Sequence, residues 1–173
     1  MTIDLMPVID EEGREFNIAA AVSFREIKSS GTLYPIIPCE DISFVLKCGS
    51  DKKLLIHGYG RIRTVIPCDR CLAPVDTELS LDFTRTVHMK DEEVADWDEE
   101  RSFIDGTVLD TDRLLQSEIL IVWPVKTLCR EDCLGICSKC GANRNIEPCS
   151  CEEESADPRM SVIRDIFNKY KEV

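Results

Sequence analysis

The chain has 173 residues, of which 31% are charged and 43% are hydrophobic, a composition typical of a globular protein of about one domain. Its formal net charge is −12, and residues 76–173 carry 23 of the 33 Asp and Glu but only 12 of the 21 Lys and Arg. This charge argues against a general polyanion binder, because nucleic-acid affinity comes largely from neutralised phosphates. No apolar run approaches the ~18 residues of a membrane span and no signal-peptide pattern opens the chain, so we expect a cytoplasmic protein without a membrane partner.

The first half of the chain has the pattern of β-strands joined by short turns. Strands are expected over residues 14–24, 41–48 and 53–68. Residues 29–41 hold a Gly and two Pro and are expected to form a loop. Gly58 and Gly60 fall inside the third strand, where glycines often mark a bulge or a close approach of the backbone.

In the second half, residues 75–89 alternate between apolar and polar side chains, which predicts a half-buried antiparallel strand. Residues 91–100 are strongly acidic and are expected to form a solvated loop. Asp110 can cap a helix that Pro124 ends. A second amphipathic helix is expected over residues 157–170, near the C-terminus.

These elements predict an α+β fold: a mainly antiparallel meander or partial barrel, one or two packed helices and a small Cys-rich zinc lobe. We expect residues 1–126 to form the β-rich body with one helix. Residues 127–173 are expected to form the Cys-rich lobe and the C-terminal helix.

Six of the ten cysteines lie within residues 129–151, in CREDCLGICSKCGANRNIEPCSC. A reducing cytosol disfavours structural disulfides, so clustered thiols there indicate metal ligands or redox groups. In CSKCG, the Cys-x-x-Cys-Gly loop lets two thiolates point at one ion while backbone N–H groups bond to the sulfurs, and the Gly allows the positive φ of a tight knuckle. The first-ranked ligand set is Cys137, Cys140, Cys149 and Cys151, and the alternates are Cys129 and Cys133.

The segment contains no His, which favours a closed structural zinc site over a catalytic one with an open position. An iron–sulfur cluster is the alternative cofactor. A separate CDRC motif holds Cys68 and Cys71, which could supply half a metal site, a redox pair or a turn between strands. We find no motif for catalysis or for a small-molecule substrate, so no enzyme is expected.

At this point the motifs resemble a known family. LLIHGYGRIRTVIPCDRCL, then a strand, an acidic loop, a helix ending at a Pro, and LCREDCLGICSKCGANRN with CSC and DPR, are similar to the YceD family, the large ribosomal RNA subunit accumulation proteins. The resemblance runs from about residue 40 to the end of the chain. It departs at Arg144, where the family pattern implies Leu, and we expect this to be a surface change.

The resemblance implies a non-enzymatic ribosome-assembly factor that supports accumulation or processing of large-subunit (23S) rRNA. The implied partner is that rRNA or a pre-ribosomal particle. Candidate RNA-binding residues form a basic and aromatic stripe on one strand face, with one more cation at the turn. They are His57, Tyr59, Arg61, Arg63 and Arg70. Acids on a neighbouring strand could instead pair with this stripe. The alternative functions are an acidic module for a basic ribosomal protein and a thiol redox sensor.

Overall fold

We analysed a computed structural model that describes residues 1–50, 53–89 and 102–151. The expected acidic loop and C-terminal helix lie outside these residues. The chain divides into two compact units. The first contains residues 1–69 and 73–129, and the second contains residues 70–72 and 130–173. In the described part of the chain, no helix is long and apolar enough to cross a bilayer.

The first unit is built on a six-stranded antiparallel sheet with the order β2-β5-β6-β4-β3, in which β7 also pairs with β6. In chain order the strands are β2 (Glu15–Ala20), β3 (Glu26–Ser29), β4 (Thr32–Pro38), β5 (Ile42–Gly49), β6 (Lys53–Pro67) and β7 (Pro74–His88). The predicted antiparallel arrangement of the last three strands is therefore confirmed, while the pairing does not close into a barrel among the residues described.

Strand β6 organises the sheet. Along one edge it pairs first with β5, from Lys53 to Tyr59, and then with β4, from Ile62 to Thr64. Along its other edge it pairs with β7 over its full length. Inward side chains of β6, such as Leu54, Ile56 and Ile62, are fully buried because alternate residues of a strand face the core.

The glycines of β6 mark close approaches, as the sequence predicts. Gly58 lies opposite Phe83 of β7, and a Cβ added to it would lie 2.3 Å from Cζ of that ring. A Cβ on Gly60 would lie 2.6 Å from Cδ1 of Ile42. At both positions a neighbouring side chain occupies the space of a Cβ and would have to shift to admit one.

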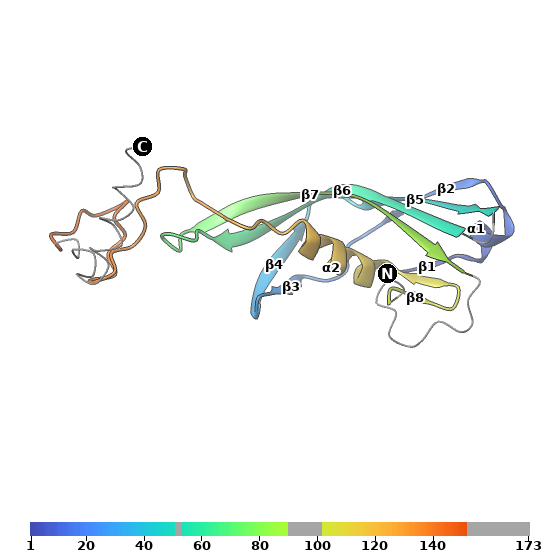
Figure 1. The fold of residues 1–173 in the computed structure, drawn as a ribbon, viewed down its shortest axis with the longest axis horizontal. Helices are drawn as coiled ribbons and strands as arrows, with labels where there is room; N and C mark the ends of the chain where they lie inside the picture. Colours follow the sequence, from blue (N-terminus) through green and yellow to red (C-terminus); the bar gives the residue numbers. More distant parts are fainter. Residues whose placement is uncertain (51–52, 90–101, 152–173) are drawn as a thin grey trace, which may run out of the picture. The chain divides into compact units, whose positions relative to one another are not determined.

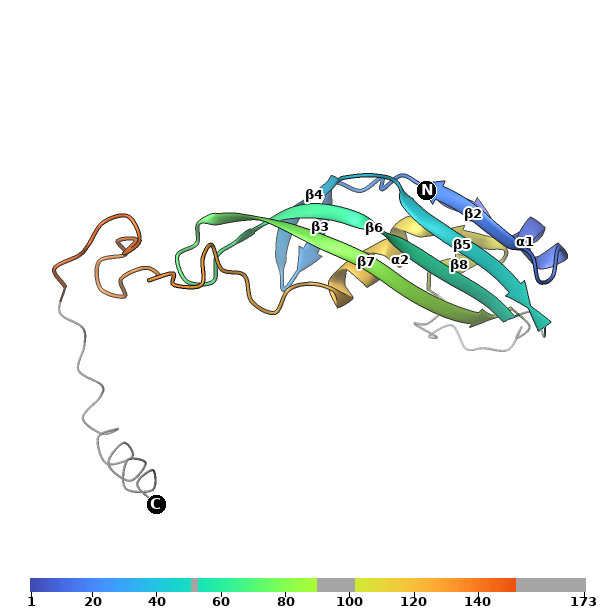
Figure 2. The same ribbon diagram turned by 90° about the horizontal axis from the view of Figure 1, so that it is seen from above.

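A second layer covers one face of this sheet (Figures 1 and 2). It consists of a three-stranded sheet of order β1-β9-β8 and of helix α2. The bounds are β1 (Thr2–Asp4), β8 (Ile104–Asp105), β9 (Val108–Asp110) and α2 (Thr111–Ile121). A short helix, α1 (Met6–Asp10), follows β1 and buries Val8. Between the layers lies one continuous hydrophobic core.

Helix α2 begins at the cap that the sequence predicts, Asp110, and ends at Ile121, before Pro124. The carboxylate of Asp110 accepts hydrogen bonds from the backbone N–H groups of Asp112 and Arg113, which satisfies the first turn. Leu114, Leu115 and Ile119 are fully buried, so the apolar face of the helix packs on the core.

Two expectations are wrong. Residues 29–41 are not a loop, because β3 and β4 form a hairpin there whose Thr32 pairs with Ser29. The first expected strand is shorter than residues 14–24, since β2 ends at Ala20. Helix α1 was not predicted.

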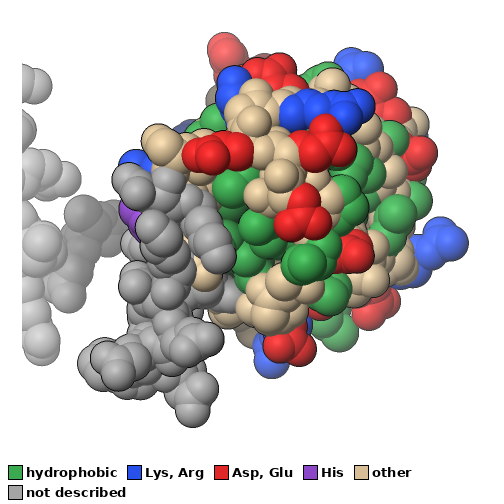
Figure 3. All heavy atoms as spheres, turned by 90° about the vertical axis from the view of Figure 1, so that its right-hand side faces the viewer, with side chains coloured by type: hydrophobic (Ala, Val, Ile, Leu, Met, Phe, Trp, Pro, Cys, Tyr) green, Lys and Arg blue, Asp and Glu red, His purple; other side chains and the backbone are tan. Residues whose placement is uncertain are grey.

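On the face of the first unit that carries α1, acidic and basic side chains are interspersed with apolar ones and do not form one charged patch (Figure 3).

Candidate metal centres

Four cysteines of the second unit gather their sulfur atoms within 4.8 Å of one another. We call this set the knuckle group: Cys137, Cys140, Cys149 and Cys151. It is the ligand set that the sequence ranks first. Cys137 is buried, Cys140 is exposed and the other two are half-buried.

The local backbone places N–H donors around the sulfur of Cys137, which stabilises the thiolate that a metal cation would bind. Backbone N–H groups of Cys140 and Lys139 donate to the sulfur of Cys137 and lower its pKa to about 6. Gly141 has φ +73°, and its N–H donates to the carbonyl of Cys137 at 2.9 Å. These are the features expected of a Cys-x-x-Cys-Gly loop, in which N–H groups stabilise thiolate charge.

The chain then returns to complete the group through a turn at Asn143 and Asn145. The side chain of Asn143 accepts from the N–H of Asn145 at 3.0 Å, and its carbonyl accepts from Ile146 at 2.9 Å. The backbone of Asn143 also bridges to Ile136, just before the knuckle. This turn brings residues 149–151 back to the first two thiols.

The pKa of Cys151 moves in the opposite direction from that of Cys137. Hydrogen bonding to Cys140, together with burial and bonding to Cys137, raises the pKa of Cys151 to about 12. A bound metal would need every sulfur as thiolate and would displace these protons. Four convergent sulfurs with no carboxylate or imidazole among them fit a closed tetrahedral site for a soft or borderline cation.

A second set of four sulfur atoms also lies within 4.8 Å of one another. We call it the hairpin group: Cys68, Cys71, Cys129 and Cys133. The first two belong to the turn between β6 and β7. The sequence suggested Cys68 and Cys71 as half a site and Cys129 and Cys133 as alternate ligands elsewhere, but did not join the two pairs.

Hydrogen bonds hold the segments that carry these cysteines. Within the first unit, the N–H of Asp69 donates to the carbonyl of Thr127 at 2.9 Å, and the N–H of Thr127 donates to the carboxylate of Asp69 at 2.7 Å. Within the second unit, Nη1 of Arg70 donates to the carbonyl of Cys133 at 2.8 Å. Arg70, a candidate RNA-binding residue, therefore contributes its guanidinium to local backbone structure.

The predicted stripe on β6 exists and faces outward, but acids line it. His57, Tyr59, Arg61 and Arg63 alternate along the exposed side of the strand. Nε of Arg61 lies 3.3 Å from Oε1 of Glu40, and Nη1 of Arg61 lies 3.8 Å from Oε1 of Glu78. Hydrogen bonding to Glu40 raises the pKa of Arg61.

The other members of the stripe also have acidic neighbours. Nη1 of Arg63 lies 3.4 Å from Oδ2 of Asp76, and Nδ1 of His57 lies 3.8 Å from Oδ1 of Asp82. The predicted alternative, in which acids on a neighbouring strand pair with the stripe, is therefore what the structure shows. Both arginines of this stripe are therefore paired with carboxylates in the structure.

Comparison with protein families identifies the family of this chain. Residues 56–167 match the model described as "Large ribosomal RNA subunit accumulation protein YceD". The chain belongs to the YceD family. The segment that matches the YceD model contains both cysteine groups and the stripe, whereas residues 1–55 lie outside it.

Relatives of this YceD-family chain occur in mycobacteria. Proteins described as uncharacterised, from Mycobacterium bovis (strain ATCC BAA-935 / AF2122/97) and from Mycobacterium tuberculosis (strains CDC 1551 / Oshkosh and ATCC 25618 / H37Rv), are each 30% identical over 117 residues. The alignments cover 66% of this chain, and the chain spans only 56% of the length of those relatives. No solved structure matches significantly.

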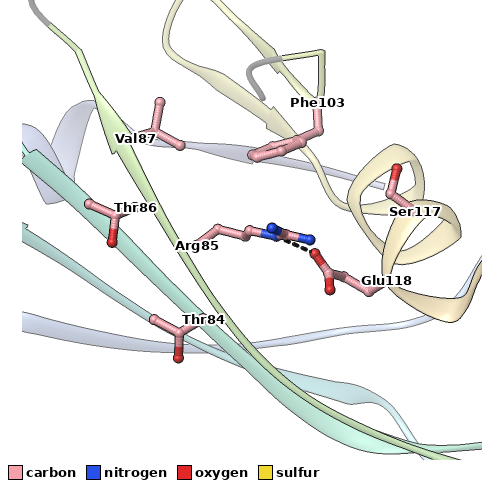
Figure 4. Close-up of a pocket in the computed structure, with 7 residues that line it drawn as sticks. All are labelled: Thr84, Arg85, Thr86, Val87, Phe103, Ser117 and Glu118. Carbon is pink, nitrogen blue, oxygen red and sulfur yellow. Dashed lines mark hydrogen bonds and ion pairs between the residues drawn. The ribbon is translucent and has the colours of Figure 1, made fainter. Parts of the chain in front are cut away.

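A cavity of about 300 Å³ lies between β7 and α2 (Figure 4). Arg85 and Glu118 point toward each other in it and form an ion pair at 2.5 Å. Because the two charges are paired with each other, we assign this pair to the attachment of α2 to the sheet.

Proposed function

We propose that this chain is a non-enzymatic ribosome-assembly factor that acts in the cytoplasm and supports accumulation or processing of large-subunit (23S) rRNA. Membership of the YceD family is the observation that carries this proposal. The described residues support the non-enzymatic part of this proposal. Their two cysteine groups are suited to hold a structural metal ion, which stabilises a fold and needs no substrate.

The test is depletion of the protein in its own cells, followed by separation of ribosomal particles on a sucrose gradient. We expect fewer large subunits and scarce or immature large-subunit rRNA. Re-expression of the intact chain should restore the normal profile. A normal gradient in depleted cells that lack a second copy of the gene would contradict the proposal.

We further propose that each cysteine group holds one structural zinc ion. Both groups offer four sulfurs, and zinc prefers four tetrahedral ligands with Zn–S distances of about 2.3 Å. Elemental analysis of the purified protein should therefore find two zinc ions per chain. Iron with a visible absorption band would indicate clusters instead, and a chain with no metal would overturn this part of the proposal.

The surface favours a second candidate for the contact with the pre-ribosome: a basic ribosomal protein. The outward face of β6 sets two arginines and a histidine against Glu40, Asp76, Glu78 and Asp82. An acidic surface attracts a cationic partner and repels bare phosphate.

Capture of the tagged chain from cell extract separates this candidate from direct rRNA contact. If a basic protein is the partner, the complex survives nuclease treatment and weakens steeply with salt. Loss of the complex on nuclease treatment would favour direct rRNA contact. In that case, changing Arg61 and Arg63 to Glu should abolish the association.

A further inference from the structure

Arg144 occupies a position beside the knuckle group that its sequence context did not predict. Its side chain is half-buried. Its guanidinium lies within hydrogen-bonding reach of the sulfurs of Cys137 and Cys149, and the interaction with Cys137 is the main cause that raises the pKa of Arg144. Arg144 also lines a hollow with Cys149 and Cys151.

The backbone fixes this placement. The N–H of Arg144 donates to the carbonyl of Gly135 at 2.9 Å. The residues on either side are also held, since Asn143 bridges to Ile136 and Nδ2 of Asn145 bonds the side chain of Asn143 at 2.8 Å. The arginine therefore projects from a turn whose hydrogen bonds fix the position of its backbone beside the knuckle group.

The contact of Arg144 with the sulfurs would offset the negative charge of a metal–thiolate centre. A divalent cation with four thiolates carries a net charge of −2, and half-buried negative charge is costly unless a cation or hydrogen-bond donors offset it. Backbone N–H groups stabilise Cys137 from the knuckle side. Arg144 brings the side-chain cation that hydrogen-bonds two of the four sulfurs.

We propose that Arg144 is a positioning residue of the knuckle group, which balances the charge of the metal–thiolate centre and orients Cys137 and Cys149 by N–H···S bonds. This inference rests on the proposal that the knuckle group binds a metal ion. Partners of this kind, one step beyond the ligands, contribute about 10- to 100-fold in metal affinity.

The test measures zinc affinity of the full-length protein by competition with a chromophoric chelator. Cys149→Ser first identifies which of the two ions belongs to the knuckle group. We expect Arg144→Met, which keeps most of the apolar stem, to lower the affinity for that ion about 10-fold and to leave the affinity for the other ion unchanged. Arg144→Lys keeps the charge but has fewer donors, so it should recover part of the affinity.

Lys126→Met is the control, because it removes a cation from an exposed side chain that belongs to neither cysteine group. It should change the affinity of the knuckle group less than twofold. Equal losses in Lys126→Met and Arg144→Met, or no loss in Arg144→Met, would overturn the inference. A wild-type chain that binds no metal at the knuckle group would overturn the metal proposal itself, which distinguishes the two failures.

Discussion

Nε of Arg85 on β7 lies 2.5 Å from Oε1 of Glu118 on α2, and the two side chains differ greatly in exposure. Glu118 retains 5% of its side-chain exposure, whereas Arg85 retains 42%. The carboxylate is thus desolvated and depends on the guanidinium, while the guanidinium can still reach water. Because of this difference in exposure, Glu118 depends more on the contact than Arg85 does.

Removing only Arg85 should therefore destabilise the first unit more than removing both charges. We expect Arg85→Met to cost about 2 kcal/mol in the free energy of unfolding, because it leaves a buried carboxylate without its cation. The double variant Arg85→Met with Glu118→Leu should recover most of this loss. Urea denaturation of the three proteins checks this, and additive effects in the double variant would contradict the coupling.

Gly58→Ala should destabilise the sheet, because the new Cβ would overlap the ring of Phe83. Overpacking of this kind typically costs about 1–3 kcal/mol. Gly49→Ala is the control: its Cβ would meet nothing closer than 3.7 Å, so it should be neutral or slightly stabilising. Thermal unfolding of both variants decides the matter, and equal melting temperatures would disprove the close packing.

Each cysteine group should lose its metal independently of the other. Cys140→Ser is expected to lower the zinc content from two ions to one, because a structural site needs all four ligands. Cys39→Ser, outside both groups, should keep two ions. Elemental analysis of the purified variants provides the measurement. Two ions in Cys140→Ser would show that the knuckle group is not a metal site.

Asp112 should contribute to stability at neutral pH and lose that contribution in acid. Burial alone would raise its pKa, but hydrogen bonds from the amino group of Met1 and from Ser23 outweigh burial and lower it. A carboxyl with a lowered folded pKa stabilises the fold above its unfolded pKa, about 3.9, and this contribution disappears as pH falls through the folded value.

The variant Asp112→Asn tests this pH dependence. Between pH 6 and pH 3, the wild-type free energy of unfolding should fall more steeply than that of Asp112→Asn. Glu12→Gln, an exposed carboxyl in the same unit, should retain the wild-type slope. Parallel slopes for wild type and Asp112→Asn would contradict the prediction.

The elements that the sequence predicts well are those whose signals are local. Alternation along β7 and the Asp110 cap of α2 lie within a few consecutive residues, so the pattern alone places them. Strand β4 was missed because Pro35 and Pro38 indicate a loop. Both are tolerated because Pro38 ends the strand and Pro35 lies in a two-stranded hairpin.

The knuckle group could be predicted because its first two ligands and the Gly after them form one short motif. The hairpin group could not, since Cys71 and Cys129 are separated by the whole of β7 and α2 and only the tertiary fold reveals their proximity. Arg144 was missed for the same reason: nothing in its neighbours shows that its side chain turns toward sulfur.

The pairing of β1 with β9 also sets an order of events during synthesis. Ile3 pairs with Leu109, and the N–H of Leu5 donates to the carbonyl of Thr107, so among the described strands β1 gains its partner only after residues 107–110 have emerged. The hairpin of β6 and β7 joins nearby residues and can form much earlier. A nascent chain halted before β9 would therefore leave β1 unpaired and expose Ile3, which is buried in the complete fold, as a target for chaperones.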